Sequence, residues 1–268
     1  MIRIVITVVV GVLLLSVFPS KAQLSPPGID GAKVVGWGAL GVQQQLGKKW
    51  SLSLYTGGSR QSDPDNTHLL HKAAIVVVNE ETQYTFNPHW RLALGTSMRI
   101  QKIYADERPY GLDNPGARNE LRYYLRLFYR HDVNRVSMSY SIRPEYRTFY
   151  THAWDKWATP LELRIRLKGQ AAIPLNETKS NQLILANEFL SAVDHYGTSS
   201  AERWSSFHFT EDRFTNYFRH TFEKPSLSVD VGVMHQFWKE KTSNRFHYTA
   251  YLSFDLLFIN PFEKKRQS

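Results

Sequence analysis

The stretch ELRYYLRLFYR, residues 120–130, places a leucine or tyrosine at every odd position and sets Glu120, Arg122, Arg126 and Arg130 between them. A period of two is typical of a β-strand, in which successive side chains point to opposite faces of the sheet. A soluble sheet buries its apolar face in a core and covers the other face with mixed polar groups. A polar face made mostly of arginine and acid predicts another architecture, with one face toward an apolar environment and the other toward a confined, charged interior.

The same alternation recurs along the chain, whereas the three-to-four spacing of an amphipathic helix is almost absent. The expected fold class is all-β: an up-and-down antiparallel transmembrane β-barrel of about 12 strands, with about 10 as the alternative. The pattern itself gives an odd number, which would start the first strand at the outer surface, so we expect a missed strand before Val34 or a wrongly divided one. The predicted strands are 34–46, 49–59, 72–86, 89–103, 118–132, 135–149, 160–173, 181–192, 211–223, 226–238 and 245–258.

Two kinds of connection alternate between these strands. Short ones include LGKKW at 46–50, FNPHW at 86–90 and HDVN at 131–134. Long, polar ones rich in Gly, Pro, Asn and Asp lie at 57–68, 105–119, 150–160 and 194–206. Transmembrane barrels have short periplasmic turns and longer extracellular loops, so the sequence predicts that the long connections lie outside the cell.

Residues 1–22 have the pattern of a signal peptide. Arg3 is followed by an apolar run from Ile4 to Phe18 and by small residues at Ser20 and Ala22. The run has about 15 residues, fewer than the about 20 that a membrane-spanning helix needs. We expect cleavage after Ala22, an N-terminal periplasmic segment at 23–33, the barrel at 34–260 and a polar C-terminal tail at 261–268. The chain has no cysteine, which excludes a disulfide framework and a lipid anchor on an N-terminal cysteine.

The formal net charge is +9, a balance that is also found in nucleic-acid-binding proteins. Export argues against nucleic acid as the partner, and the placement of the arginines between apolar residues accounts for the charge. We therefore predict outer-membrane lipids as the partner and no nucleic acid. Partner proteins cannot be predicted from the sequence.

We predict that the apolar face of the strands contacts lipid and that the charged face points into the barrel lumen. Aromatic residues near strand ends, such as Trp50, Trp90 and Phe222, suit the headgroup level of a membrane. The predicted lipid-facing residues are Leu121, Tyr123, Leu125, Leu127, Met138, Tyr140, Leu163 and Ile165. The predicted lumen charge network consists of Glu120, Arg122, Arg126, Arg143, Glu145, Arg147, Glu162, Arg164, Arg166 and Glu188.

Charge matching predicts the register of the strands that carry this network. A turn at Val133 and Asn134 places Arg122 opposite Glu145 and Glu120 opposite Arg147. A turn one residue earlier would place like charges directly opposite each other, which is destabilising. The next strand then pairs Arg147 with Glu162 and Glu145 with Arg164. We interpret the network as a structural plug, and the alternative is an anion-binding lumen, because Arg99, Arg126, Arg130 and Arg143 outnumber nearby acids.

Several segments together resemble the domain of unknown function twenty-four-ninety, an uncharacterised family of Gram-negative outer-membrane β-barrels. They are GWGALGVQQQLGKKWSLSLYTGGSR, NPHWRLALGTSMR, RPEYR, EDRFTNYFRHTFEKPSLSVDVGVMHQFW and RFHYTAYLSFDL. The resemblance covers nearly all of the chain after the signal peptide. It implies an outer-membrane location and a barrel fold, and it implies no activity and no site residues.

No motif for catalysis or for binding a cofactor or a metal is found. Ser205, Ser206 and His208 are close in sequence, but a serine nucleophile also needs fixed geometry and an orienting group. His68 and His71 lack the further ligands of a metal site and are interpreted as surface residues. We therefore predict a non-enzymatic outer-membrane barrel, either structural or a narrow solute or anion channel. The alternatives are an outer-membrane lipid-modifying enzyme and a soluble exported ligand-binding β-protein.

Overall fold

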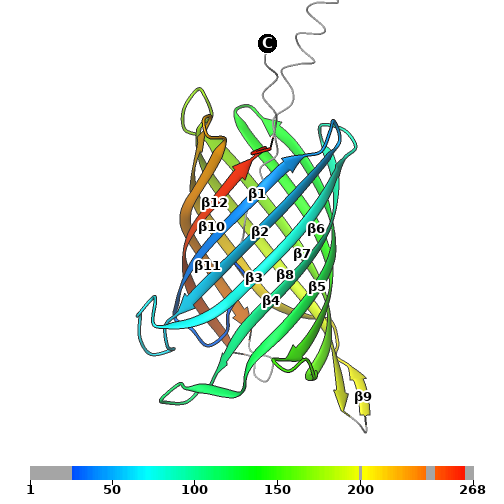
Figure 1. The fold of residues 1–268 in the computed structure, drawn as a ribbon, viewed down its shortest axis with the longest axis vertical. Helices are drawn as coiled ribbons and strands as arrows, with labels where there is room; N and C mark the ends of the chain where they lie inside the picture. Colours follow the sequence, from blue (N-terminus) through cyan, green and yellow to red (C-terminus); the bar gives the residue numbers. More distant parts are fainter. Residues whose placement is uncertain (1–25, 199–200, 240–244, 263–268) are drawn as a thin grey trace, which may run out of the picture.

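The computed structural model describes residues 26–198, 201–239 and 245–262 and consists of β-strands joined by turns and loops (Figure 1). None of these residues forms a helix long and apolar enough to span a membrane. The predicted signal peptide at 1–22 and most of the predicted C-terminal tail lie outside the described residues. The strands are β1 (Val34–Gln45), β2 (Trp50–Gln61), β3 (Lys72–Thr85), β4 (Trp90–Tyr104), β5 (Leu112–Val133), β6 (Val136–Thr151), β7 (Lys156–Pro174), β8 (Asn181–Thr198), β9 (Ala201–Trp204), β10 (His208–Phe222), β11 (Leu227–Lys239) and β12 (Phe246–Ile259).

Eleven of these strands close into a barrel, and β9 pairs only with β8 as a hairpin beyond the wall. Neighbouring strands are antiparallel except at the seam, where β1 and β12 pair in parallel, from Val34 opposite Ala250 to Gln43 opposite Ile259. The predicted all-β barrel with about 12 strands is confirmed. The seam also explains the odd number, because a parallel pair closes an odd-stranded barrel with neither a missed nor a divided strand.

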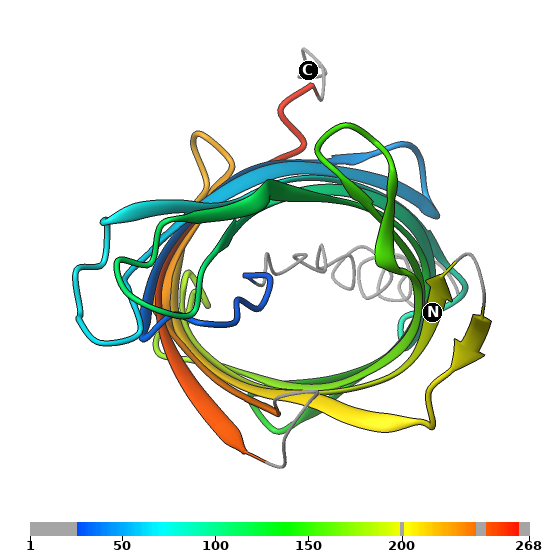
Figure 2. The same cartoon turned by 90° about the horizontal axis from the view of Figure 1, so that it is seen from below.

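The segment that precedes β1 lies inside the barrel, visible in blue in Figure 2. The backbone N–H of Ile29 donates to Tyr251 Oη at 2.7 Å and to Gln236 Oε1 at 3.2 Å. Thr249 Oγ1 donates to the carbonyl oxygen of Ala32 at 2.8 Å. The predicted periplasmic segment at 23–33 is, in its described part, a component of the lumen. This path brings the chain to the long-loop end, where β1 begins.

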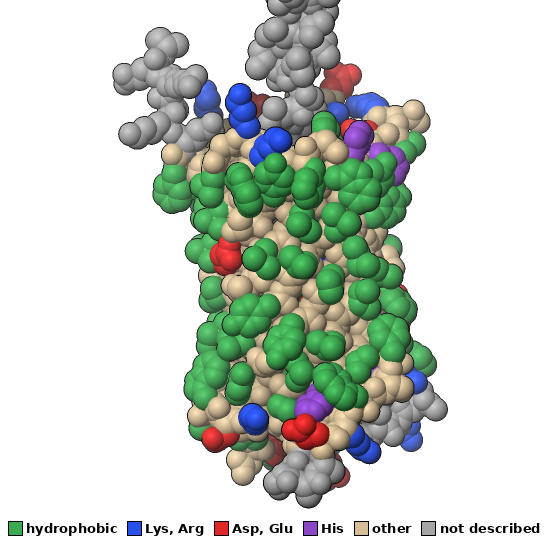
Figure 3. All heavy atoms as spheres, turned by 90° about the vertical axis from the view of Figure 1, so that its right-hand side faces the viewer, with side chains coloured by type: hydrophobic (Ala, Val, Ile, Leu, Met, Phe, Trp, Pro, Cys, Tyr) green, Lys and Arg blue, Asp and Glu red, His purple; other side chains and the backbone are tan. Residues whose placement is uncertain are grey.

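The outer wall is apolar along its middle. Large apolar side chains at alternate positions are exposed on every long strand, for example Leu94, Leu125 and Phe254. On the face shown in Figure 3 such side chains cover the centre, and charged side chains and histidines gather mainly at the two ends. All eight residues predicted to face lipid occupy outward positions, and five of them are among the exposed large side chains.

The predicted register of β5 with β6 is wrong by two residues. Val133 pairs with Val136, so the turn consists of Asn134 and Arg135, and Arg122 lies opposite Arg147. Asn134 has a φ of 54°, a left-handed conformation that asparagine adopts more readily than most residues. The turn therefore determines the register, and the charges pair diagonally. The predicted opposition of Arg147 to Glu162 and of Glu145 to Arg164 is present between β6 and β7.

All four predicted long loops are shorter in the structure because strands continue into them; β2, for example, ends at Gln61 inside the loop predicted at 57–68. β5 begins at Leu112 inside the loop predicted at 105–119, and β6 and β7 extend into the one at 150–160. The loop predicted at 194–206 is largely the hairpin of β8 with β9.

Glycines inside the barrel make room for aromatic rings on neighbouring strands. A Cβ on Gly57 would lie 2.5 Å from the Trp37 ring, and one on Gly95 would lie 2.3 Å from the Tyr124 ring. Both approaches are too close for any side chain, so these two positions require glycine.

Candidate functional site

The inward face of β5, β6, β7, β8 and β10 carries a closed ring of alternating charges. Each member forms ion pairs within 4 Å with its two neighbours in the ring. We call this set the charge ring; in order it is Glu120, Arg147, Glu162, Arg164, Glu211, Arg213, Glu188, Arg166, Glu145 and Arg122.

Four strands build most of the ring from the same local pattern, a glutamate followed two residues later by an arginine, and on β5, β7 and β10 the two residues pair with each other. The distances within these pairs are 2.6 Å for Arg122 with Glu120, 2.8 Å for Arg164 with Glu162 and 2.7 Å for Arg213 with Glu211. Residues two apart on a strand point to the same face, so the pairs all face the lumen.

Arg147 connects two of these strands. Its guanidinium donates to both carboxylate oxygens of Glu120, at 2.8 and 2.9 Å, and also to Glu162. The direct opposition of Arg122 and Arg147 is tolerated because both arginines share the Glu120 carboxylate. Buried charges need such partners, since an unpaired charge away from water is costly.

The ring contains eight of the ten residues predicted for the network. The other two lie beside it: Arg126 pairs with Glu81 at 3.2 Å, and Arg143 pairs with Glu145. Glu211 and Arg213 belong to the ring but are not among the predicted residues. They have the same two-residue spacing as Glu120 and Arg122, and this repeated spacing is the sequence signal by which they can be identified.

The ring and the N-terminal segment close the long-loop half of the lumen together. Arg213 donates to the carbonyl oxygen of Pro26 at 3.2 Å, and Arg99 donates to that of Gly28 at 2.9 Å. Beyond them lies an apolar cluster at the same end. It consists of Ile29, Ala32, Val35, Ala74, Ile75, Met234 and Tyr251.

The short-turn half of the lumen is a cavity of about 420 Å³, which we call the vestibule. Turn residues such as Asn134, Thr178 and Ser226 line its mouth, Pro27 lines its inner end, and no described residue of the long loops contributes to it. Eleven basic side chains and four acidic ones line it. The basic ones are Arg91, Arg99, Arg122, Arg126, Arg130, Arg135, Arg143, Arg166, Lys168, Lys179 and Arg219; the acidic ones are Glu81, Asp132, Glu188 and Glu223.

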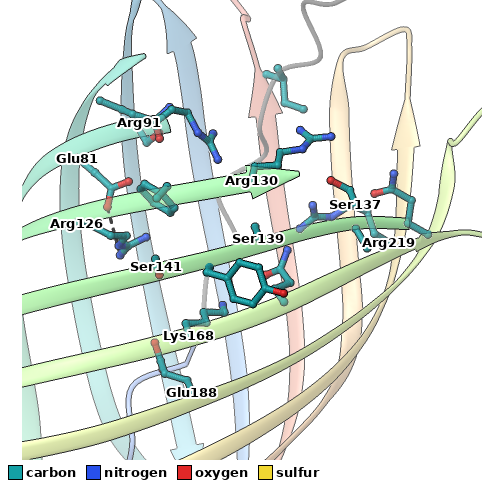
Figure 4. Close-up of a pocket in the computed structure, with 18 of the residues that line it drawn as sticks. Glu81, Arg91, Arg126, Arg130, Ser137, Ser139, Ser141, Lys168, Glu188 and Arg219 are labelled. Carbon is teal, nitrogen blue, oxygen red and sulfur yellow. Dashed lines mark ion pairs between the residues drawn. The ribbon is translucent and has the colours of Figure 1, made fainter. Parts of the chain in front are cut away.

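Hydroxyl groups accompany the cations of the vestibule. Ser137, Ser139 and Ser141 lie along the inward face of β6, between the arginines of β5 and Lys168 of β7 (Figure 4). Hydroxyl, guanidinium and ammonium groups all donate hydrogen bonds to oxyanions. The vestibule is therefore chemically suited to an anion.

Two vestibule arginines, Arg91 and Arg135, form no ion pair with a carboxylate in the described part of the chain. The Arg91 guanidinium lies over the Phe128 ring, 5.0 Å from its centroid. Arg143 lies 4.5 Å from the centroid of Tyr124. The aromatic contact of Arg91 holds that cation in place without neutralising its charge, whereas Arg143 also pairs with Glu145.

The serine–histidine group considered in the sequence is not a catalytic arrangement. His208 Nε2 lies 3.6 Å from Asp194, but Ser205 Oγ donates to the carbonyl oxygen of Ser206 and accepts from the N–H of Asp194. His68 and His71 lie with their ring centroids 6.2 Å apart. Within the described ranges, no group of three or more His, Cys, Asp or Glu is arranged to hold a metal ion.

The chain matches the model of a known protein family. Residues 35–247 match the model of a family described as "Protein of unknown function (DUF2490)", and the match covers well over half of the chain. No curated protein matches the sequence.

Proposed function

We propose that this chain, which belongs to the DUF2490 family of proteins of unknown function, is a non-enzymatic outer-membrane barrel that binds an anionic solute in its lumen. The solute enters from the periplasmic side, through the mouth between the short turns. The observation that carries the proposal is the basic vestibule, which is open at the short turns and blocked at its other end.

The outer wall supports a membrane location. Strands of 12 to 22 residues in the barrel wall exceed the about 9–11 that cross a bilayer in a tilted barrel. Monomeric soluble proteins seldom expose a contiguous apolar patch larger than a few hundred Å². The continuous apolar belt therefore favours a membrane barrel over a soluble exported protein, and the signal-peptide pattern favours export.

The vestibule supports anion binding. Its volume of about 420 Å³ lies within the range of small-molecule sites, about 300–1,000 Å³. The excess of basic over acidic side chains leaves a positive potential, which a low-dielectric wall concentrates. The charged groups of the charge ring are compensated by one another through salt bridges. Arg91 and Arg135 form no such salt bridge in the described part of the chain, so their charge is available for a ligand.

The blocked end favours binding over conduction. A conducting channel needs a continuous polar path, and the N-terminal segment, the charge ring and the apolar cluster occupy the long-loop half of the lumen. A lipid-modifying enzyme receives no support from Ser205, whose hydroxyl is engaged with the backbone.

Binding of defined anions to the purified protein in detergent tests this function. The probes are inorganic phosphate, pyrophosphate and citrate, with glucose as the neutral control, measured by calorimetry at low and high salt. At least one anion is expected to bind, and binding should weaken with salt. Because a charge-assisted hydrogen bond is worth about 1.5–3 kcal/mol, Arg91→Gln should weaken affinity by about 10-fold or more.

The matched control is Arg108→Gln, in a loop at the other end of the barrel, which should leave affinity unchanged. Planar-bilayer recordings of the full mature chain should show no stable open pore. Absence of binding for all three anions, or equal affinity of the Arg91 and Arg108 variants, would contradict the proposal. Stable conductance would favour the channel.

A further inference from the structure

The outer wall carries an apolar groove at the long-loop end, separate from the vestibule and the charge ring. Its volume is about 550 Å³. Gly36, Gly38 and Gly58 form its floor on β1 and β2, and Leu252 and Phe254 of β12 lie along one side. On the rest of the wall most outward positions carry larger side chains.

The groove follows from where the glycines fall in the register. Gly38 and Gly58 are direct partners across β1 and β2, so two bare positions lie side by side. A Cβ added to Gly58 would lie 3.5 Å from the Ile75 carbonyl oxygen, and one on Gly38 would lie 3.7 Å from that of Phe254. Both are ordinary contacts, so packing does not require glycine at either position, and the space beyond them is open.

The loop at 62–71 folds back and forms the wall of the groove at the long-loop end of the barrel. Leu69 and Leu70 lie over Gly36, where an added Cβ would be 3.3 Å from each. The Arg60 guanidinium donates to the carbonyl oxygens of Leu70 and His71 at 2.7 and 3.0 Å, which fixes the end of the loop on the wall.

Two cations stand at the long-loop rim of the groove. Arg60 pairs across the sheet with Gly36 and with Ala73, and Lys102 follows Ile100 on β4. Neither forms an ion pair with a carboxylate among the described residues. The backbone carbonyls that Arg60 contacts orient its guanidinium but leave its positive charge uncompensated. The groove is thus apolar along its length and cationic at the end nearest the loops.

We propose that this groove holds an acyl chain of a phosphate-bearing anionic lipid, with the phosphate at Arg60 and Lys102. The proposal rests on the membrane location proposed above and adds a specific lipid site to it. An acyl chain in the groove makes dispersion contacts with the protein on several sides, whereas an acyl chain on a smooth wall makes them on one side only. Basic residues at the level of the headgroups attract anionic lipids, and this charge complementarity selects the occupant.

Native mass spectrometry of the full mature protein in detergent tests the site. Phosphatidylglycerol and phosphatidylcholine with the same chains are added in parallel. One phosphatidylglycerol should be retained preferentially, and Lys102→Gln should reduce the preference about five-fold. Lys156→Gln, an exposed lysine at the same end, is the control for charge.

Filling the groove separates a specific site from general lipid contact. Gly58→Leu places a side chain in the groove without a backbone clash and should abolish the retained lipid. Gly169→Leu is the matched control, because Gly169 is an outward glycine outside the groove, where an added Cβ would lie 3.8 Å from the Tyr140 ring. Glycerol phosphate, which has no acyl chain, should not displace the lipid.

Equal retention of the two lipids, retention in Gly58→Leu, or equal loss in Gly169→Leu would overturn the proposal. Displacement by glycerol phosphate, or a dimer that only Gly58→Leu removes, would overturn it as well. Resistance to alkaline extraction from vesicles tests the membrane location separately. If the protein integrates into vesicles but shows no lipid preference, the lipid site in the groove alone is disproved. If the protein does not integrate, both proposals are disproved.

Discussion

Replacing Arg147 tests whether the charge ring stabilises the barrel. The Arg147 side chain is 3% exposed and bridges Glu120 and Glu162. Removing one partner of a buried ion pair costs about 3–5 kcal/mol, because the remaining charge is left uncompensated. In Arg147→Met, Glu120 keeps Arg122 at 2.6 Å and Glu162 keeps Arg164 at 2.8 Å. We therefore expect a loss at the lower end of that range, about 3 kcal/mol.

Urea unfolding in lipid vesicles, followed by the fluorescence of the seven tryptophans, measures this loss. The control is Arg108→Met, which removes the exposed pair of Arg108 with Asp65 and should leave stability within experimental error. The double variant Arg147→Met, Glu162→Gln should recover part of the loss, with a coupling energy above about 0.5 kcal/mol. A loss no larger than that of Arg108→Met would show that the ring contributes nothing to stability, and additive effects would show that Arg147 and Glu162 do not interact.

Three further predictions concern the wall and the loops. Leu127→Arg places a charge on the outward face of β5 and should destabilise the vesicle-inserted protein by about 2–4 kcal/mol if it lies near the bilayer midplane; an unchanged folding yield would argue against a lipid-facing wall. Trypsin added to intact cells should cleave after Arg203, in the hairpin of β8 with β9 beyond the wall, whereas cleavage only at Lys48, in a short turn, would invert the topology. The hydrogen bond from Lys72 lowers the pKa of Asp63, so its contribution is present above the ordinary aspartate pKa and is lost as pH falls through the lowered one. The rate at which pepsin cuts the loop at 62–71, divided by its rate on Asp63→Asn at the same pH, should therefore rise as pH falls from about 5 toward 2.

Alternation alone predicted the strands and the direction of their side chains. The positions of Leu125 and Arg126 follow from the period of two, whatever the neighbouring strand does. Register was harder to predict, because it depended on a single turn residue. Asn134 adopts a positive φ and places the turn one position later than predicted. The β6 partner of each β5 residue, including Arg122, therefore shifts by two residues.

The charge ring was predicted only in part because most of its ion pairs run along strands or diagonally between them, and only Arg147 with Glu162 and Arg213 with Glu188 lie directly opposite each other. Arg122 reaches Glu120 on its own strand, a contact that the matching of directly opposite charges does not predict. The lumenal path of 26–33 could not be recognised, because PPGIDGAK has the composition of a loop. The odd strand number was the available sign, since it requires the chain to reach the long-loop end before β1 begins.

The parallel seam of β1 with β12 has a consequence for the order of assembly. Hairpins between consecutive strands close short loops, whereas the seam joins the two ends of the strand sequence and carries the largest loop-closure entropy. We expect the hairpins to form first and the seam last. The segment at 26–33 must then be in place before the seam closes, because its hydrogen bonds to Tyr251 and Thr249 lie beside β1 on the inner wall. A barrel closed with this segment outside would have to reopen the seam to admit it, so the last pairing step is also the step that traps a misassembled chain.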